Sequence, residues 1–252
     1  MAEAYVTSVT QQGITSIEFF HPQSNSLPGN VLQELGKKIT QAGEDPATLV
    51  IILRSGEDKA FCAGASFDEL AAIQNEAEGL KFFSGFAHVI NAMRTCPKLI
   101  IGRIQGKCVG GGVGLAASVD YAIAAEGADI KLSELALGIG PFVVGPVVER
   151  KIGMAGFSHL AIDAGSWRNA DWAKRKGLYA ELHPDPESMD ESIKKLANTL
   201  LHSSPEAMAE IKKISWKGTE HWDQLLPERA AISGRLVLSD FTRNAIEKFK
   251  TK

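Results

Sequence analysis

Cysteine is scarce in this sequence. The chain of 252 residues has three, Cys62, Cys96 and Cys108, and no two of them form a CxxC pair. An odd number without paired spacing argues against a disulfide framework and against a thiolate metal site. The six histidines show no HExxH or other metal-ligand spacing. The sequence therefore predicts a protein of a reducing compartment with no catalytic metal.

Long hydrophobic runs and an excess of one charge are also missing. No apolar stretch approaches the roughly 18 residues of a membrane span, and the N-terminal residues resemble neither a signal peptide nor a transit peptide. Lys plus Arg number 27 against 30 for Asp plus Glu, which gives a net charge of −3 and no basic field for nucleic acid. We expect a cytoplasmic protein whose partners include neither membrane nor nucleic acid.

Apolar runs that alternate with helical stripes are present in the first half of the chain. Residues 49–55, 99–106 and 121–126 are continuous apolar runs typical of strands buried on both faces, and residues 5–9 and 14–20 indicate a hairpin broken at Gly13. Apolar stripes within 31–39 and 80–93 have helical spacing. This alternation predicts an α/β fold.

The character of the sequence changes after about Pro184. Residues 188–204, 204–218 and 222–249 are amphipathic and lack strand signals, and Ser204 before Pro205 is typical of a helix start. We therefore predict a helical C-terminal region on the α/β core. Core packing explains most of its apolar stripes, and an oligomer interface is the alternative.

Glycines cluster after apolar runs in three segments: residues 61–68 (FCAGASFD), 106–120 (GKCVGGGVGLAASVD) and 133–146 (SELALGIGPFVVGP). Tight turns or close helix packing are the ordinary explanation. Gly112, Gly114 and Ala117 match the loose dinucleotide fingerprint, but Glu134 does not close a strand as that site requires. The sequence contains no phosphate loop and no GxSxG.

Taken together and in this order, the three segments resemble the crotonase (enoyl-CoA hydratase/isomerase) superfamily. The resemblance extends from the SNSL segment at residues 24–27 to the terminal helix. It implies a spiral of ββα turns and then helices that form a homotrimer, often a dimer of trimers. It also implies an acyl-CoA thioester substrate, with coenzyme A as part of that substrate and no other cofactor. On this basis we divide the chain into a catalytic core, 1–195, and a helical region for oligomerisation and an active-site lid, 196–252.

The resemblance also implies the catalytic groups. The backbone N–H groups of Ala65 and Gly111 would hold the oxygen of a thioester enolate, whose formation requires such donors in a water-poor pocket. Glu134 would be the acid/base, since an apolar pocket raises a carboxyl pKa towards a useful value. Taken alone, a Glu at the start of a short helix is usually a capping residue.

The residues expected to bind the acyl-CoA substrate come from the first half of the chain and from its last residues. Phe82, Phe83 and Phe86 could line the acyl pocket, although core packing is the ordinary role of such residues. The resemblance implies that Phe249 and Lys252 bind the substrate, and a solvated C-terminal end is an equally good interpretation of these residues. The binding residues implied by the resemblance are Asn25, Ser26, Leu27, Ala65, Ser66, Phe67, Asp68, Gly111, Phe249 and Lys252.

One position departs from the family pattern. Hydratases of this superfamily carry a first Glu where this chain has Gly114. Hydration shares its work between two glutamates, whereas shifting a double bond from β,γ to α,β needs one base that moves one proton. The single Glu134, and the Pro141-Phe142 pair, resemble enoyl-CoA isomerases. A branched-chain hydratase, a thioester hydrolase or decarboxylase, and a non-enzymatic acyl-CoA-binding scaffold are the alternatives.

Overall fold

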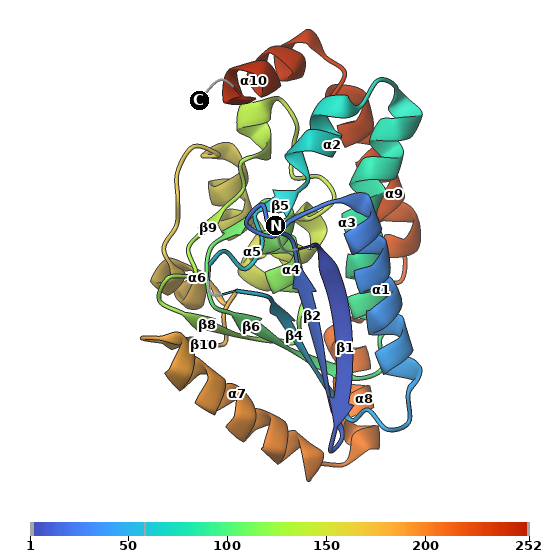
Figure 1. Cartoon of the computed structure of the whole chain (residues 1–252), viewed down its shortest axis with the longest axis vertical. Coiled ribbons are helices and arrows are strands. Elements are labelled where there is room, and N and C mark those ends of the chain that lie inside the picture. Colours follow the sequence, from blue (N-terminus) through green and yellow to red (C-terminus); the bar gives the residue numbers. More distant parts are fainter. Residues whose placement is uncertain (1–2, 58, 251–252) are drawn as a thin grey trace.

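A six-stranded sheet organises the computed structural model, which describes residues 3–57 and 59–250, with side chains to residue 248 (Figure 1). Its order is β1-β2-β4-β6-β8-β10, with β1 antiparallel to β2 and the other pairs parallel. Gln12 and Gly13, both with positive φ, form the predicted hairpin turn. The strands are β1 (Tyr5–Gln11), β2 (Ile14–Phe20), β4 (Val50–Ser55), β6 (Leu99–Ile104), β8 (Tyr121–Ala125) and β10 (Glu181–His183).

Helices cover both faces of this sheet, as continuous apolar strands require. Val50 and Ile101 pack with Met189 of α7 (Pro186–Leu201) on one face, and Figure 1 shows α7 running along that side. Ile51 belongs to the large core on the other face, which includes residues of α1 (Gly29–Glu44), α3 (Glu76–Thr95) and α4 (Gly111–Ser118). Ile39 of α1 is fully buried there. The predicted α/β fold is confirmed.

Two short parallel sheets bring the glycine-rich segments together. One pairs β3 (Ser26–Leu27) with β5 (Gly64–Ala65), and the other pairs β7 (Cys108–Val109) with β9 (Ile130–Lys131). A backbone β-bridge between Cys62 and Cys108 joins these two sheets. The three cysteines are free and buried. Segments distant in sequence therefore converge at one edge of the core.

The C-terminal half is mostly helical. Helix α9 (Trp222–Leu236) runs antiparallel along α3: Arg94 Nη2 lies 2.6 Å from Asp223 Oδ1 at one end, and Gly79 packs against Gly234 at the other. Ser204 is the N-cap of α8, where its side chain accepts a hydrogen bond from Ala207 N. The remaining helices are α2 (Phe67–Ala72), the 3₁₀ turn η1 (Glu134–Leu137), α5 (Gly145–Ile162), α6 (Ala170–Lys176), α8 (Pro205–Ser215), α9 (Trp222–Leu236) and α10 (Asp240–Lys250).

The helical region starts with α7 at Pro186, close to the predicted change near Pro184. Helix α7 continues through residue 195, and Trp216 and Trp222 share the large core with the sheet. The division at residue 195 into two functional regions stays a prediction. Within the described residues, no helix combines the length and apolarity needed to cross a membrane.

Candidate active site

A cavity of about 730 Å³ lies where the glycine-rich segments meet. All three segments contribute to its wall, through residues that fall within 63–67, 109–111 and 133–144. Phe82, Phe83 and Phe86 of α3 line it as well, so their place is the cavity and not the core alone. Helix α10 closes one side through Ala245. A large, mostly apolar cavity with a few polar groups is typical of a binding site.

Two backbone N–H groups at this cavity are free of partners in the secondary structure. Ser66 N donates to Leu27 O at 2.9 Å, and because successive amides of a strand alternate sides, the Ala65 N–H faces away from β3. Gly111 is the first residue of α4, where an N–H has no acceptor within the helix and the helix dipole is positive. Both residues line the cavity. The structure thus places Ala65 and Gly111 at one cavity, and their role as donors to an enolate oxygen stays a prediction.

Glycine is required at three neighbouring positions for different reasons. Gly64 has φ +96°, and a β-carbon there would lie 3.0 Å from Val109 O and 3.6 Å from Gly111 N. At Gly110, with φ +52°, a β-carbon would lie 3.0 Å from Glu134 Oε1. At Gly111 it would lie 2.3 Å from the Phe86 ring, so this glycine makes room for a phenylalanine that lines the cavity.

Glu134 begins η1 and is an acidic residue of the cavity wall. Its Oε2 is buried and has no hydrogen-bond partner among the described residues. Burial raises the pKa of Glu134 to about 7, with a smaller opposing effect from a hydrogen bond to its own backbone. Ile139 N donates to Glu134 O at 3.0 Å and fixes the turn. Glu134 is the only carboxylate among the described residues that line the cavity.

Val144 occupies the space beside Gly114. A β-carbon at position 114 would lie 2.5 Å from Val144 Cγ1, and Gly114 is buried. A glutamate cannot be placed there without moving Val144.

The described residues also contain no group of three or more His, Cys, Asp or Glu that could hold a metal ion. Among the described residues, the acidic side chains of the cavity wall are limited to Glu134.

The ten predicted coenzyme A residues divide into three groups. Ser26, Ala65, Phe67 and Gly111 line the cavity, and Ser26 Oγ donates to Ala65 O at 2.8 Å. Four others are not part of its wall: the Asn25 amide donates to Gly56 O and Ala60 O, Leu27 is fully buried, Ser66 caps α2, and Asp68 is exposed beside Gln23. Of the remaining two, Phe249 belongs to α10 but its side chain lies outside the described part, and Lys252 lies outside the described residues.

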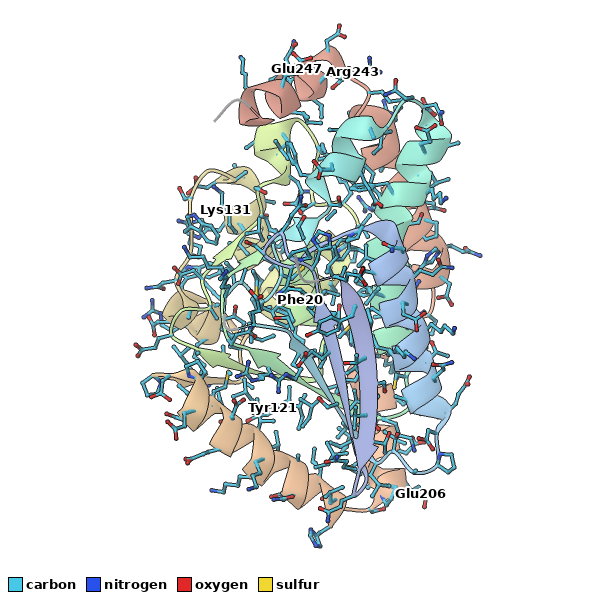
Figure 2. All side chains as sticks on the ribbon, viewed as in Figure 1. Phe20, Tyr121, Lys131, Glu206, Arg243 and Glu247 are labelled. Carbon is cyan, nitrogen blue, oxygen red and sulfur yellow. The ribbon has the colours of Figure 1, made fainter. Side chains whose placement is uncertain are left out.

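Several cavity residues were not predicted from the sequence. Lys131, labelled in Figure 2, extends from β9, and Trp167 lies nearby with the Lys107 and Lys131 ammonium groups 4.9 Å and 5.7 Å from its ring centre. Ser233 of α9 and Gln23 also line the cavity. Lys131 could have been found from its place three residues before Glu134, whereas Trp167 and Ser233 follow no local pattern.

Comparison with known proteins agrees with this geometry. The family model described as enoyl-CoA hydratase/isomerase matches residues 9–248. The chain belongs to this family, within the crotonase superfamily. It is 30% identical over 207 residues to a carnitinyl-CoA dehydratase of Salmonella enteritidis, which covers 82% of this chain and 78% of that protein. It is 26% identical over 249 residues to a Bacillus subtilis protein named "Probable enoyl-CoA hydratase", with 98% and 96% covered.

Solved structures show the same fold. An enoyl-CoA hydratase from Bacillus halodurans superposes with a TM-score of 0.89 at 22% identity, covering 97% of this chain and 99% of that one. An enoyl-CoA hydratase from Mycobacterium avium gives 0.86 at 23% identity, covering 99% and 97%. The crotonase fold is therefore shared along the whole chain. As a member of this family, the protein is an acyl-CoA enzyme.

Proposed function

We propose that this crotonase-superfamily enzyme moves the double bond of an enoyl-CoA from the β,γ to the α,β position. The observation that carries the proposal is the single carboxylate, Glu134, at a cavity where Val144 fills the space beside Gly114. Glu134 removes a proton from the α-carbon, and the electron pair moves into the thioester to form a dienolate. Glu134 then returns the proton to the γ-carbon, so that atoms and charge balance with one group.

The dienolate oxygen needs donors that are already in place. The N–H groups of Ala65 and Gly111 serve this purpose, and the N-terminus of α4 adds its positive dipole end. Loss of one such donor typically costs about 2.7–4 kcal/mol in the transition state. The pKa of Glu134 near 7 suits a group that both takes and gives a proton near neutral pH. No group outside the chain and the acyl-CoA enters this scheme.

Hydration of an enoyl-CoA is the second candidate, because relatives are named as hydratases and dehydratases. It requires a water activated by one group and a proton delivered by another. The described cavity wall offers no second carboxylate for that task. A carnitinyl group would also bring a quaternary ammonium, which aromatic faces bind best. Here Lys107 and Lys131 already cover the face of Trp167, so we do not extend that substrate to this chain.

A paired assay separates the two reactions. β,γ- and α,β-unsaturated acyl-CoA thioesters are offered in parallel, with absorbance of the conjugated thioester and product mass as readouts. Isomerisation predicts rising absorbance from the β,γ substrate with unchanged mass. Loss of absorbance from the α,β substrate with one water added to the mass would replace the proposal with hydration. Free coenzyme A with no change in either double bond would indicate thioester hydrolysis.

The family also suggests an oligomeric state, a localisation and a partner. We propose that the enzyme acts as a homotrimer or a dimer of trimers in the cytoplasm, with acyl-CoA as its small-molecule partner. Exposed apolar side chains support an assembly of this kind, among them Ile162 at 75% and Ile214 at 68% exposure. Mass measurement of the purified protein in solution tests it. A monomer at micromolar concentration would contradict it.

A further inference from the structure

Ser233 is a buried polar residue in an otherwise apolar part of the cavity. It lies on α9, is 1% exposed, and lines the cavity. The other described cavity residues on α2, α3 and α9 are apolar: Phe67, Leu70, Phe82, Phe83 and Phe86. The Ser233 hydroxyl faces the cavity and is not one of the described polar atoms that are fully buried without a partner. Ser118 of α4 differs, since its hydroxyl bonds to Gly114 O one turn back at 2.7 Å.

The position of Ser233 places it away from the reacting atoms. Its neighbour Gly234 packs against Gly79 near the start of α3, where a β-carbon at Gly79 would lie 2.6 Å from Gly234 Cα. Phe86, which lies against Gly111, is two helical turns further along α3, or about 10 Å. The thioester carbonyl is proposed to bind at Gly111. Ser233 therefore lies several carbon atoms along an acyl chain that follows α3.

Close helix packing does not by itself explain a serine here. The crossing of α3 and α9 requires glycine at Gly79 and Gly234. At the neighbouring position 233 an alanine would be smaller than the serine that is present, so packing alone does not call for the hydroxyl. The Ser233 hydroxyl is not one of the fully buried polar atoms that lack a partner, because it opens onto the cavity, where water or a ligand can bond to it. Ser233 thus has the properties of a group that recognises a substrate.

Resting on the proposed function, we propose that Ser233 is a specificity-determining residue that hydrogen-bonds an oxygen on the acyl chain, remote from the thioester. The substrate class is then an enoyl-CoA whose acyl group carries a hydroxyl or carbonyl oxygen near its distal end. A serine hydroxyl can donate to either group and can accept from a hydroxyl. An unsubstituted chain of the same length leaves Ser233 without a partner and binds less tightly.

The test uses matched pairs of saturated acyl-CoA thioesters, which bind without reacting, over a series of chain lengths. Each pair differs only in a terminal hydroxyl in place of a terminal hydrogen. Calorimetric titration of the whole protein should show preferential binding of the hydroxylated member at one chain length. In Ser233→Ala that preference should fall roughly threefold to tenfold. The unsubstituted member should bind the variant more tightly, because the unpaired hydroxyl is gone.

Ser84→Ala is the matched control, because Ser84 is a buried serine of α3 that is not part of the cavity wall. The control should retain the wild-type preference. Equal weakening of both ligands by Ser233→Ala would overturn the inference and make Ser233 a packing residue. Absence of a preference in the wild type at every length would overturn it as well. These titrations require no turnover, so their failure is distinct from a failure of the isomerase assay.

Discussion

Val144 Cγ1 lies 2.5 Å from the place where a side chain at Gly114 would begin. The two residues come from different elements: Gly114 is in the first turn of α4, and Val144 precedes α5. Their contact closes the position where hydratases of the superfamily carry a first glutamate. The absence of that carboxylate is therefore built into the packing and is more than a change of one residue.

Gly114→Glu should destabilise the protein, because its side chain must displace Val144 from a packed core. Overpacking of this kind costs about 1–3 kcal/mol, measurable as a lower urea midpoint. The double variant Gly114→Glu/Val144→Gly should recover part of that loss and gain measurable addition of water to an α,β-unsaturated acyl-CoA. The single variant Val144→Gly is the control for cavity formation. A double variant no more stable than Gly114→Glu would show that Val144 is not the obstacle.

Glu134→Gln should abolish most of the isomerisation. General acid–base groups typically contribute about 10²–10⁴ in rate, while the amides of Ala65 and Gly111 are left in place. We therefore expect kcat to fall by that factor and acyl-CoA affinity to be retained in calorimetric titration. Glu206→Gln, at the exposed start of α8, is the control and should keep full activity. Activity that survives in Glu134→Gln would remove Glu134 from the mechanism.

The pH dependence follows from the pKa of Glu134, which burial raises to about 7. The base must be ionised to take a proton, so kcat/KM for a β,γ-unsaturated acyl-CoA should rise with pH and reach half its plateau near pH 7. A rate profile over a pH series in one mixed buffer measures this. A midpoint near 4.5, the ordinary value for a glutamate, would show that the carboxyl is solvated in the free enzyme.

The same shift affects stability with a definite sign. Folding raises the pKa of the Glu134 carboxyl from 4.5 to about 7, so the folded state holds its proton more tightly than the unfolded state does. The free energy of unfolding therefore falls as pH rises from about 4.5 through about 7. Glu134→Gln keeps the neutral form at every pH. The variant should match the wild type near pH 4.5 and exceed it above pH 7, by on the order of 3 kcal/mol. Urea unfolding at both pH values measures the difference, which should be absent for Glu206→Gln.

Local sequence patterns predicted the main strands and helices of this protein well. The hairpin at Gly13, the buried strands and the helix start at Ser204 depend on periodicity and turn chemistry within a few residues. The family followed from three motifs in order, and the structure brings Ala65, Gly111 and Glu134 to one cavity.

The site features that the sequence did not predict depend on contacts between residues distant in sequence. Asn25 looked like a ligand residue, but its amide is used by the carbonyls of Gly56 and Ala60 in a neighbouring loop. The sequence does not reveal why residue 111 is a glycine, whereas the structure shows that the ring of Phe86 from α3 occupies the space beside it. Ser233 gives no signal in the sequence because only the crossing of α3 and α9 brings it to the cavity. Such features depend on which helices meet, which periodicity does not specify.

Gly138→Ala should lower both stability and activity, because Gly138 ends the turn that begins at Glu134 and lies against α10. Gly138 has φ +80°, and a β-carbon there would lie 2.5 Å from Phe241 Cδ1 and 2.6 Å from Thr242 Oγ1 of α10. Gly177→Ala is the control: its φ is +87°, but the nearest atom to its β-carbon would be 3.4 Å away. Both variants carry left-handed strain of about 1–2 kcal/mol, and only Gly138→Ala adds a clash that moves Glu134. We therefore expect similar moderate losses in urea midpoint for the strain alone, a further loss for Gly138→Ala, and a fall in kcat in that variant only. Equal kcat in the two variants would show that α10 does not position the catalytic turn.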